Sequence, residues 1–159
     1  MRRVPTGQME TELDPWVRVA RESDEDEIAL HRDLARREAT LYRGSLSGEC
    51  GAASERISFV GGVGATVMGS LSAFESDVDR WHIAHVYVVE AAREVGIGDL
   101  LLSTCLATLL SRGATWCGGD ALPGDRRTKN LFERHGLVAQ MIVVGKSLSG
   151  PSSEVDASQ

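Results

Sequence analysis

The chain has 159 residues, of which 42% are hydrophobic and 25% charged, the balance of one ordinary water-soluble domain with a single core. A formal net charge of −6 argues against non-specific binding of nucleic acid. The longest apolar stretch, residues 100–110, is too short to span a bilayer, so no membrane contact is expected.

The three cysteines form an odd set without the spacing of a disulfide framework or a zinc site. They are Cys50, Cys105 and Cys117. Such a set is typical of reduced thiols in the cytoplasm, and we expect no bound metal. The N-terminal residues contain arginines but not the apolar segment of a secretion signal, which favours the same location.

Residues 1–14 and 148–159 are polar and lack apolar periodicity, so we expect tails on either side of one domain at residues 15–147. Within the domain, Trp16–Ala20 alternates between apolar and polar residues and predicts a first strand. Ser23 is expected to cap the next element, a helix whose first turn carries a cluster of carboxylates.

The later elements form a mixed series of strands and helices. Alternating and β-branched residues predict strands, glycines mark the turns, and longer periodic stretches predict helices. In chain order these are the helix to residue 38, strands at 57–61, 65–74 and 81–89, a helix at 98–112, a strand at 115–118, a helix at 125–135 and a final strand or strands at 137–146. This order predicts an α/β fold (α+β, with a mixed sheet) in which one central, mostly antiparallel sheet has helices on both faces.

The most informative segment is residues 86–102, where a strong strand ends, the chain turns, and Gly96 and Gly98 open an apolar helix. The first N–H groups of a helix have no intrahelical partners and lie at the positive end of its dipole, so they can bind a diphosphate. Glycine lets the phosphate approach without meeting a Cβ atom. Spacing alone would equally fit glycines that only ease a tight turn, and the patterns of a Rossmann loop and a P-loop are absent from the sequence.

The context of this loop favours the first interpretation. Arg93-Glu94-Val95-Gly96-Ile97-Gly98 resembles the Arg/Gln-x-x-Gly-x-Gly/Ala signature of the GNAT superfamily of acyl-CoA-dependent N-acyltransferases. A second segment, Asn130–Leu137, is similar to the Leu-Tyr-Glu-Lys-x-Gly-Phe element near the C-terminus of that family. The resemblance extends over residues 16–147 as an ordered series of elements.

The resemblance implies a GNAT fold in which the fourth and fifth strands splay apart and leave a gap for the pantetheine arm of acetyl-CoA. The pyrophosphate would bind the backbone amides of the loop, with Arg93 either adding charge or bracing the loop. The cofactor-binding residues implied in this way are Val86, Val88, Arg93, Glu94, Val95, Gly96, Ile97, Gly98, Asp99, Asp125 and Phe132.

An amine that attacks the thioester directly needs a base for its proton. Counting back from Arg93, the resemblance places the base position of the family at His82, and a free imidazole, with a pKa of about 6.5, can take a proton at neutral pH. Glu75 and Asp79, in the preceding turn, are rival candidates that would act through a water. Strict alternation puts His82 and His85 on opposite faces of the strand. A histidine on a central strand is often a structural donor, and we interpret His85 in this way.

The chain departs from the family at the step that protonates the leaving thiolate. A tyrosine that often supplies this proton is replaced by Phe132, a frequent asparagine by Asp125, and the terminal phenylalanine of the second element by Leu137. We expect solvent to be the donor, with Tyr87 and Cys117 as the side-chain alternatives.

The sequence therefore predicts a cytoplasmic N-acetyltransferase that passes the acetyl group of acetyl-CoA to a primary amine, small or peptide-borne, in a ternary complex. Two alternatives stay open: a non-catalytic acyl-CoA-binding sensor or structural domain, motivated by Phe132, and transfer of a longer acyl chain. Residues 137–146 are short for two strands, so that side of the cleft is expected to be open or completed by a second subunit in a homodimer.

Overall fold

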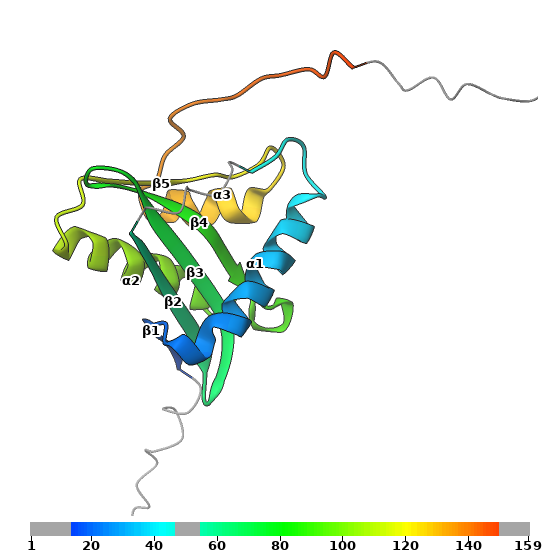
Figure 1. The fold of residues 1–159 in the computed structure, drawn as a ribbon. Coiled ribbons are helices and arrows are strands. Elements are labelled where there is room, and N and C mark those ends of the chain that lie inside the picture. The colour runs from blue at the N-terminus through cyan, green and yellow to red at the C-terminus, as the bar shows by residue number, and fades with distance from the viewer. Residues whose placement is uncertain (1–13, 47–54, 150–159) are drawn as a thin grey trace, which may run out of the picture.

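The computed structural model describes residues 14–46 and 55–149, which form one five-stranded sheet with helices on both faces (Figure 1). The elements are β1 (Pro15–Val19), the 3-10 helix η1 (Glu22–Asp24), α1 (Glu25–Ala39), β2 (Arg56–Val63), β3 (Thr66–Asp77), β4 (Arg80–Val88), the 3-10 helix η2 (Glu90–Ala92), α2 (Ile97–Ser111), β5 (Trp116–Gly119) and α3 (Arg126–Arg134). The strand order is β1-β2-β3-β4-β5, antiparallel except for the parallel pair β4–β5. The predicted α/β fold with a mixed sheet is confirmed. No helix in the described part of the chain is long and apolar enough to cross a membrane.

The two faces of the sheet differ in chemistry, because successive strand residues point to opposite sides. Phe59 and Leu71 of the sheet pack against Leu101 and Leu102 of α2, and all four side chains are fully buried. The face toward α1 carries serine and histidine side chains instead. The apolar core therefore lies between the sheet and helices α2 and α3, whereas the opposite face carries polar side chains beneath α1.

The strands β4 and β5 separate partway along β4. Their pairing joins Arg80–Ile83 to Trp116–Gly119, whereas β4 continues to Val88. Beyond Ile83, the edge of β4 that faces β5 is no longer paired with it. The predicted splay between the fourth and fifth strands is confirmed, but it begins after Ile83 and not after Val88, where the resemblance had placed it. Strand backbone borders the gap that it opens.

A β-bulge at Ala84 changes which side chains of β4 share a face. The register between β3 and β4 shifts at Ser72 and Ala73, which makes Ala84 the extra residue of β4. As a result, His82 and His85 border the same cavity on the α1 side of the sheet. The prediction that they lie on opposite faces is wrong, because strict alternation holds only for a strand without a bulge.

The start of α1 also differs from the prediction. A 3-10 turn at Glu22–Asp24 precedes the helix, and the Asp24 carboxylate accepts from Arg21 N–H at 2.7 Å and pairs with Arg18 at 2.6 Å. A carboxylate accepts hydrogen bonds more strongly than a neutral hydroxyl does. Asp24, rather than the expected Ser23, therefore organises this turn.

The expected final strand at 137–146 does not form. These residues leave α3 as an extended chain that runs away from the sheet (Figure 1). Val138 and the run Met141–Val144 have 62–87% of their surface exposed. Their β-propensity is a preference for packing on a pleated surface, and the described strands offer them none here.

The expected tails, 1–14 and 148–159, and residues 47–54 of the expected loop before β2 lie almost wholly outside the described residues.

Candidate functional site

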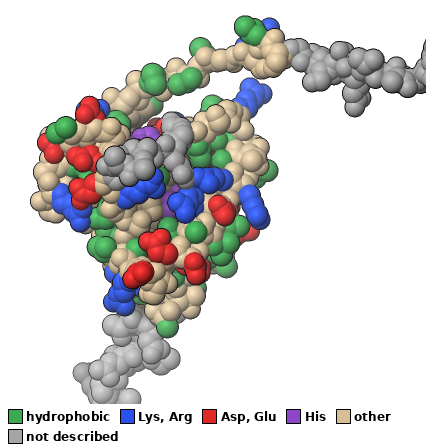
Figure 2. Space-filling model, viewed as in Figure 1, with side chains coloured by type: hydrophobic (Ala, Val, Ile, Leu, Met, Phe, Trp, Pro, Cys, Tyr) green, Lys and Arg blue, Asp and Glu red, His purple; other side chains and the backbone are tan. Residues whose placement is uncertain are grey.

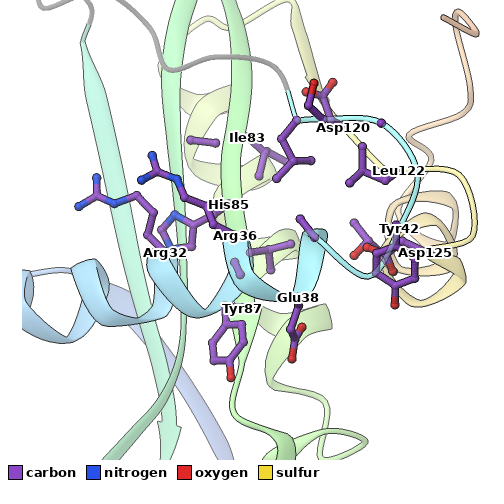
Figure 3. A pocket seen from close by; sticks show the side chains of 18 of the residues that line it. Arg32, Arg36, Glu38, Tyr42, Ile83, His85, Tyr87, Asp120, Leu122 and Asp125 are labelled. Atoms are coloured by element: carbon purple, nitrogen blue, oxygen red, sulfur yellow. The ribbon is translucent and has the colours of Figure 1, made fainter. Parts of the chain in front are cut away.

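Two cavities meet at the splayed end of β4. The loop cavity, of about 640 Å³, lies between the end of β4, the residue 93–99 loop and α3. The α1 cavity, of about 420 Å³, lies between α1, β4 and the segment that follows β5 (Figure 3). Both are bordered by Glu38, Val86, Tyr87 and Thr128, so the two cavities are adjacent there.

The loop cavity is built on the N-terminus of α2. Gly96 has a φ of 96°, in the left-handed region that favours glycine, and its carbonyl oxygen accepts from Leu100 N–H at 3.0 Å. The amides of Ile97, Gly98 and Asp99 precede this bond and lie at the positive end of the helix dipole. The loop therefore presents the set of donors that a diphosphate needs.

Gly98 faces the groove between β4 and α3. A Cβ atom at this position would lie 3.7 Å from the side chains of both Val88 and Leu131, an ordinary contact distance. The protein could therefore hold a larger residue here, but that residue would take up groove space beside the helix N-terminus.

Arg93 braces the loop. Its Nε donates to Val88 O at 2.9 Å, its guanidinium pairs with Glu38, and it lies over the Tyr87 ring. Glu38 also pairs with Arg127 at 3.3 Å. Of the two roles left open for Arg93, these contacts support bracing.

Asp99 ties α2 to α3. Its carboxylate accepts from Arg134 at 3.1 Å and lies 2.9 Å from His135 Nε2. The hydrogen bond from Arg134 holds the pKa of Asp99 below its usual range. This pairing offsets a negative charge that would otherwise repel a phosphate, and it leaves the Asp99 amide for ligand binding.

The α1 cavity contains the predicted base. Arg32 and Arg36 border it from α1, His82 from β4, and Asp120 from the segment after β5. His82 Nε2 lies 3.6 Å from Asp120 Oδ2, and the His82 ring packs at a tilt against Phe74. A carboxylate near one ring nitrogen can hold the orientation of the ring and stabilise the imidazolium that forms when it takes a proton.

We expect Asp120→Asn to lower kcat by about 10-fold, less than loss of the base itself would. The amide keeps the shape of the side chain but removes the charge that would stabilise the protonated ring. Steady-state kinetics with an amine acceptor measure this effect. Asp77→Asn is the matched control, because Asp77 is an exposed aspartate that bonds Val78 N–H outside the cavities. Equal kcat in the two variants would contradict a role for Asp120.

Most of the predicted cofactor residues come together in the structure. Those that border the loop cavity are Val86, Val88, Arg93, Glu94, Gly96, Ile97, Gly98 and Asp99. Val95 is 44% exposed and does not border it. Asp125 and Phe132 border the α1 cavity instead, where Asp125 caps α3 by accepting from Thr128 N–H and Phe132 is buried in the core.

The rival bases are Glu75, near the end of β3, and Asp79, in the turn between β3 and β4, and they border neither cavity. Glu75 Oε1 accepts from Asp79 N–H at 3.0 Å, and Asp79 has a φ of 57°. The Glu75 carboxylate thus stabilises the turn. Of the three candidates, His82 is the one that borders a cavity.

Sequence reasoning missed four charged residues of the α1 cavity, Arg32, Arg36, Glu38 and Asp120. Asp120 directly follows β5. The sequence feature that could have identified it is a carboxylate at the end of a strand that is expected to splay. Arg32 and Arg36 fit the solvated face of an amphipathic helix, and only the packing of α1 on the sheet brings them to a cavity.

Neither a metal cluster nor a reactive thiol is found among the described residues. No group of three or more His, Cys, Asp or Glu side chains in them is placed to hold a metal ion. Burial raises the pKa of Cys105 to about 12 and that of Cys117 to about 11, so both thiols stay protonated at neutral pH. The third cysteine, Cys50, lies outside the described residues.

A buried hydrogen-bonded chain lies between α1 and the sheet. Ser70 Oγ is 2.9 Å from His31 Nδ1 and 3.0 Å from His85 Nε2, and Glu27 Oε1 is 3.3 Å from His31 Nε2. Ser70 and His31 are fully buried, and His85 is 8% exposed. Burial lowers the pKa of both histidines, that of His85 to about 4, so both rings are uncharged at neutral pH.

We therefore expect acid to destabilise the fold through His85. A histidine in the unfolded chain has a pKa of about 6.5. Burial holds the pKa of His85 at about 4, helped by the charges of Arg32, of His31 once acid protonates it, and of Arg36. The unfolded state then takes up the proton first. The contribution of His85 to the free energy of unfolding is fully present above about pH 6.5 and is lost as the pH falls toward 4. Between pH 7 and pH 5 the loss is about 2 kcal/mol.

Urea unfolding followed by tryptophan fluorescence at the two pH values measures this loss. The control is His85→Asn, which cannot titrate at this position and should lose less stability over the same interval. If the variant and the wild type lose the same free energy of unfolding, groups other than His85 are responsible.

The comparisons with known proteins fit this geometry. The model of the acetyltransferase (GNAT) family matches residues 12–137. A putative acetyl transferase from Pyrococcus furiosus has a TM-score of 0.64 at 17% identity, with 85% of this chain and 100% of that one covered. An aminoglycoside acetyltransferase from an uncultured soil metagenomic sample has a TM-score of 0.63 at 14% identity, with 86% and 97% covered.

A third solved structure, AAC(6')-Iy in complex with the bisubstrate analog CoA-S-monomethyl-acetylneamine, has a TM-score of 0.63 at 10% identity, with 86% of this chain and 99% of that one covered. At such identities these likenesses show the fold. A sequence search of curated proteins gave no match.

Proposed function

Because the chain belongs to the GNAT family of acetyltransferases, we propose that it transfers the acetyl group of acetyl-CoA to a primary amine by direct attack in a ternary complex. The new carbon–nitrogen bond forms as the carbon–sulfur bond breaks, the amine loses a proton, and the thiolate gains one. The α1 cavity, of about 420 Å³, has the size of a small-molecule site and would take the amine.

The observation that carries this proposal is the meeting of the two cavities at the splay of β4 and β5. The helix N-terminus beside Gly98 would bind the diphosphate, and the open edge of β4 would bind the pantetheine arm. Val86 and Tyr87 border both cavities, so the thioester would lie beside them, facing the amine.

His82 would act as the general base, since it borders the α1 cavity and Asp120 lies beside it. The thiolate would take its proton from solvent. Phe132 carries no proton to donate, and the Cys117 thiol, with a pKa raised by burial to about 11, is a weak acid packed against the core. Tyr87 borders both cavities and is the side-chain alternative.

The second candidate function is an acyl-CoA-binding sensor without turnover. Phe132 favours it, because the ring stands where the family often has a tyrosine donor and its Cζ atom packs closely on Gly119. In this view the loop cavity would bind the cofactor and the α1 cavity would not support transfer.

Calorimetric titration with acetyl-CoA, followed by a free-thiol assay over a panel of primary amines, separates the two functions. A transferase binds acetyl-CoA and releases thiol in proportion to the acceptor. Binding without acceptor-dependent release would favour the sensor, and the absence of binding would contradict both functions.

A further inference from the structure

The α1 cavity lies where the side chains on the inner face of α1 become small. In the first half of the helix, Ile28 and His31 are buried, and His31 contacts Ser70 of the sheet. One and two turns after His31, the same face of the helix carries Ala35 and Ala39, which border the cavity. A methyl group fills much less space than an isoleucine side chain or an imidazole ring, which leaves room for a ligand between the helix and the sheet.

Larger apolar side chains border the rest of this space. Four of them, the apolar wall, come from different segments: Tyr42 after α1, Phe74 of β3, Leu122 after β5 and Phe132 of α3. A Cβ atom at Gly124 would lie 3.5 Å from Tyr42, and one at Gly44 would lie 3.8 Å from Leu122. These contacts pack the chain after α1 against the segment after β5 and hold the wall in place.

The carboxylates of the described residues that border the cavity are engaged within the protein. Glu38 pairs with two arginines beside the loop cavity. Asp120 lies beside His82, and Asp125 caps α3. A second ammonium group on the acceptor would therefore meet carboxylates that already have partners.

The positive side chains lie away from the apolar wall. Figure 3 shows Arg32 and Arg36 toward the end of the cavity opposite Tyr42 and Leu122. Figure 2 shows Lys and Arg side chains on the surface near the middle of this face, with histidine between them. The wall is mostly below the surface, because three of its four side chains are buried, so what it offers a ligand is apolar contact.

We propose that the acceptor is a primary amine attached to an uncharged apolar group, such as a phenyl ring or a short alkyl chain. The amine would lie toward His82, and the apolar group would lie between the α1 alanines, Ala35 and Ala39, and the apolar wall. Burial of apolar surface would supply the binding energy, at about a 4-fold gain in affinity for each buried methylene group. This inference rests on the proposed acetyl transfer and adds the class of acceptor to it.

Amines that differ in their apolar group test the inference in the free-thiol assay. For hexylamine and phenylethylamine we expect kcat/KM at least about 10-fold above that of ethylamine. Hexamethylenediamine has the length of hexylamine but would bring a second ammonium group against the apolar wall. Because burial of a charge without a partner is costly, its kcat/KM should be at least about 10-fold below that of hexylamine.

Filling the cavity from α1 tests the position of the apolar group. Ala35→Leu and Ala39→Leu should each lower the kcat/KM ratio of phenylethylamine to ethylamine at least about 5-fold, with KM for acetyl-CoA unchanged, because neither alanine borders the loop cavity. Ala29→Leu is the matched control, because Ala29 is on the same helix but does not border the cavity. Circular dichroism checks folding, and the second filled position serves if one variant does not fold.

A binding measurement gives the same answer without turnover. The probes are N-acetylphenylethylamine and N-acetylethylamine, titrated into the wild-type protein and into Ala35→Leu. The wild type should bind the phenyl compound at least about 10-fold more tightly, and the variant should bind the two with similar affinity.

Equal kcat/KM for ethylamine and the larger amines, or a preference for the diamine, would overturn the inference even if acetyl transfer is confirmed. A preference for the larger amines that both filled variants keep would also overturn it. If no amine releases thiol but the phenyl probe binds and Ala35→Leu removes that preference, the proposed transfer fails while the class of ligand stands.

Discussion

Gly98→Val is expected to raise the dissociation constant of acetyl-CoA at least about 100-fold while the fold persists. The backbone at Gly98 is itself a predicted ligand, so a side chain there stands where the diphosphate must approach. The structure leaves ordinary contact distances, 3.7 Å, between a Cβ atom at this position and Val88 or Leu131. A Cβ atom at this position therefore meets no close contact within the protein, and we expect the binding of acetyl-CoA to be affected more than the fold.

Calorimetric titration of acetyl-CoA measures this effect, with circular dichroism as the check on folding. Gly145→Val is the matched control, because a Cβ atom at Gly145 would meet nothing within 4 Å and its residue is outside both cavities. A folded Gly98→Val protein that binds acetyl-CoA as the wild type does would show that the loop is not the diphosphate site.

His82→Gln should lower turnover by roughly 10²–10⁴-fold near neutral pH, the usual contribution of a general base. Glutamine can hydrogen-bond but cannot take up the proton of the amine. The loss should shrink at high pH, where more of the acceptor is already unprotonated. The pH dependence of kcat for the variant and the wild type gives both parts of this prediction.

His135→Gln is the control for the histidine substitution, because His135 contacts Asp99 and borders neither cavity. Its pH–rate profile should keep the wild-type shape. If the His82→Gln profile also keeps that shape and its height, His82 has no part in the proton transfer, and a base outside the sequence-derived candidates must be sought.

The fold could be predicted from the sequence wherever local signals agreed with one another. The apolar helix after Gly98 and its end at Gly113, which has a φ of 87°, followed from periodicity and from the conformational freedom of glycine. The splay was implied by the resemblance and depended on one recognisable loop. These features are local in sequence, so a single chain contains enough information to predict them.

The errors arose where the answer depends on a partner segment. Residues 137–146 have strand composition, but a strand also needs a neighbour, and none of the described strands pairs with them. The faces of His82 and His85 depend on a bulge that no residue type at Ala84 announces. The positions of Arg32 and Asp120 beside the α1 cavity depend on how distant elements pack, which spacing along the chain does not encode. A second subunit at the C-terminal segment stays a prediction.

The bulge at Ala84 also affects how this chain should be compared with its relatives. One added residue in β4 turns every side chain on one flank of the bulge to the opposite face of the sheet. An alignment without gaps through β4 would therefore match side chains that point to opposite faces. A related chain without that residue would direct the aligned side chain to the opposite layer of the molecule. In a relative that lacks the bulge, the equivalent of His82 must therefore be sought on the same face of the strand, and the distance from Arg93 that located it in this chain would mislead.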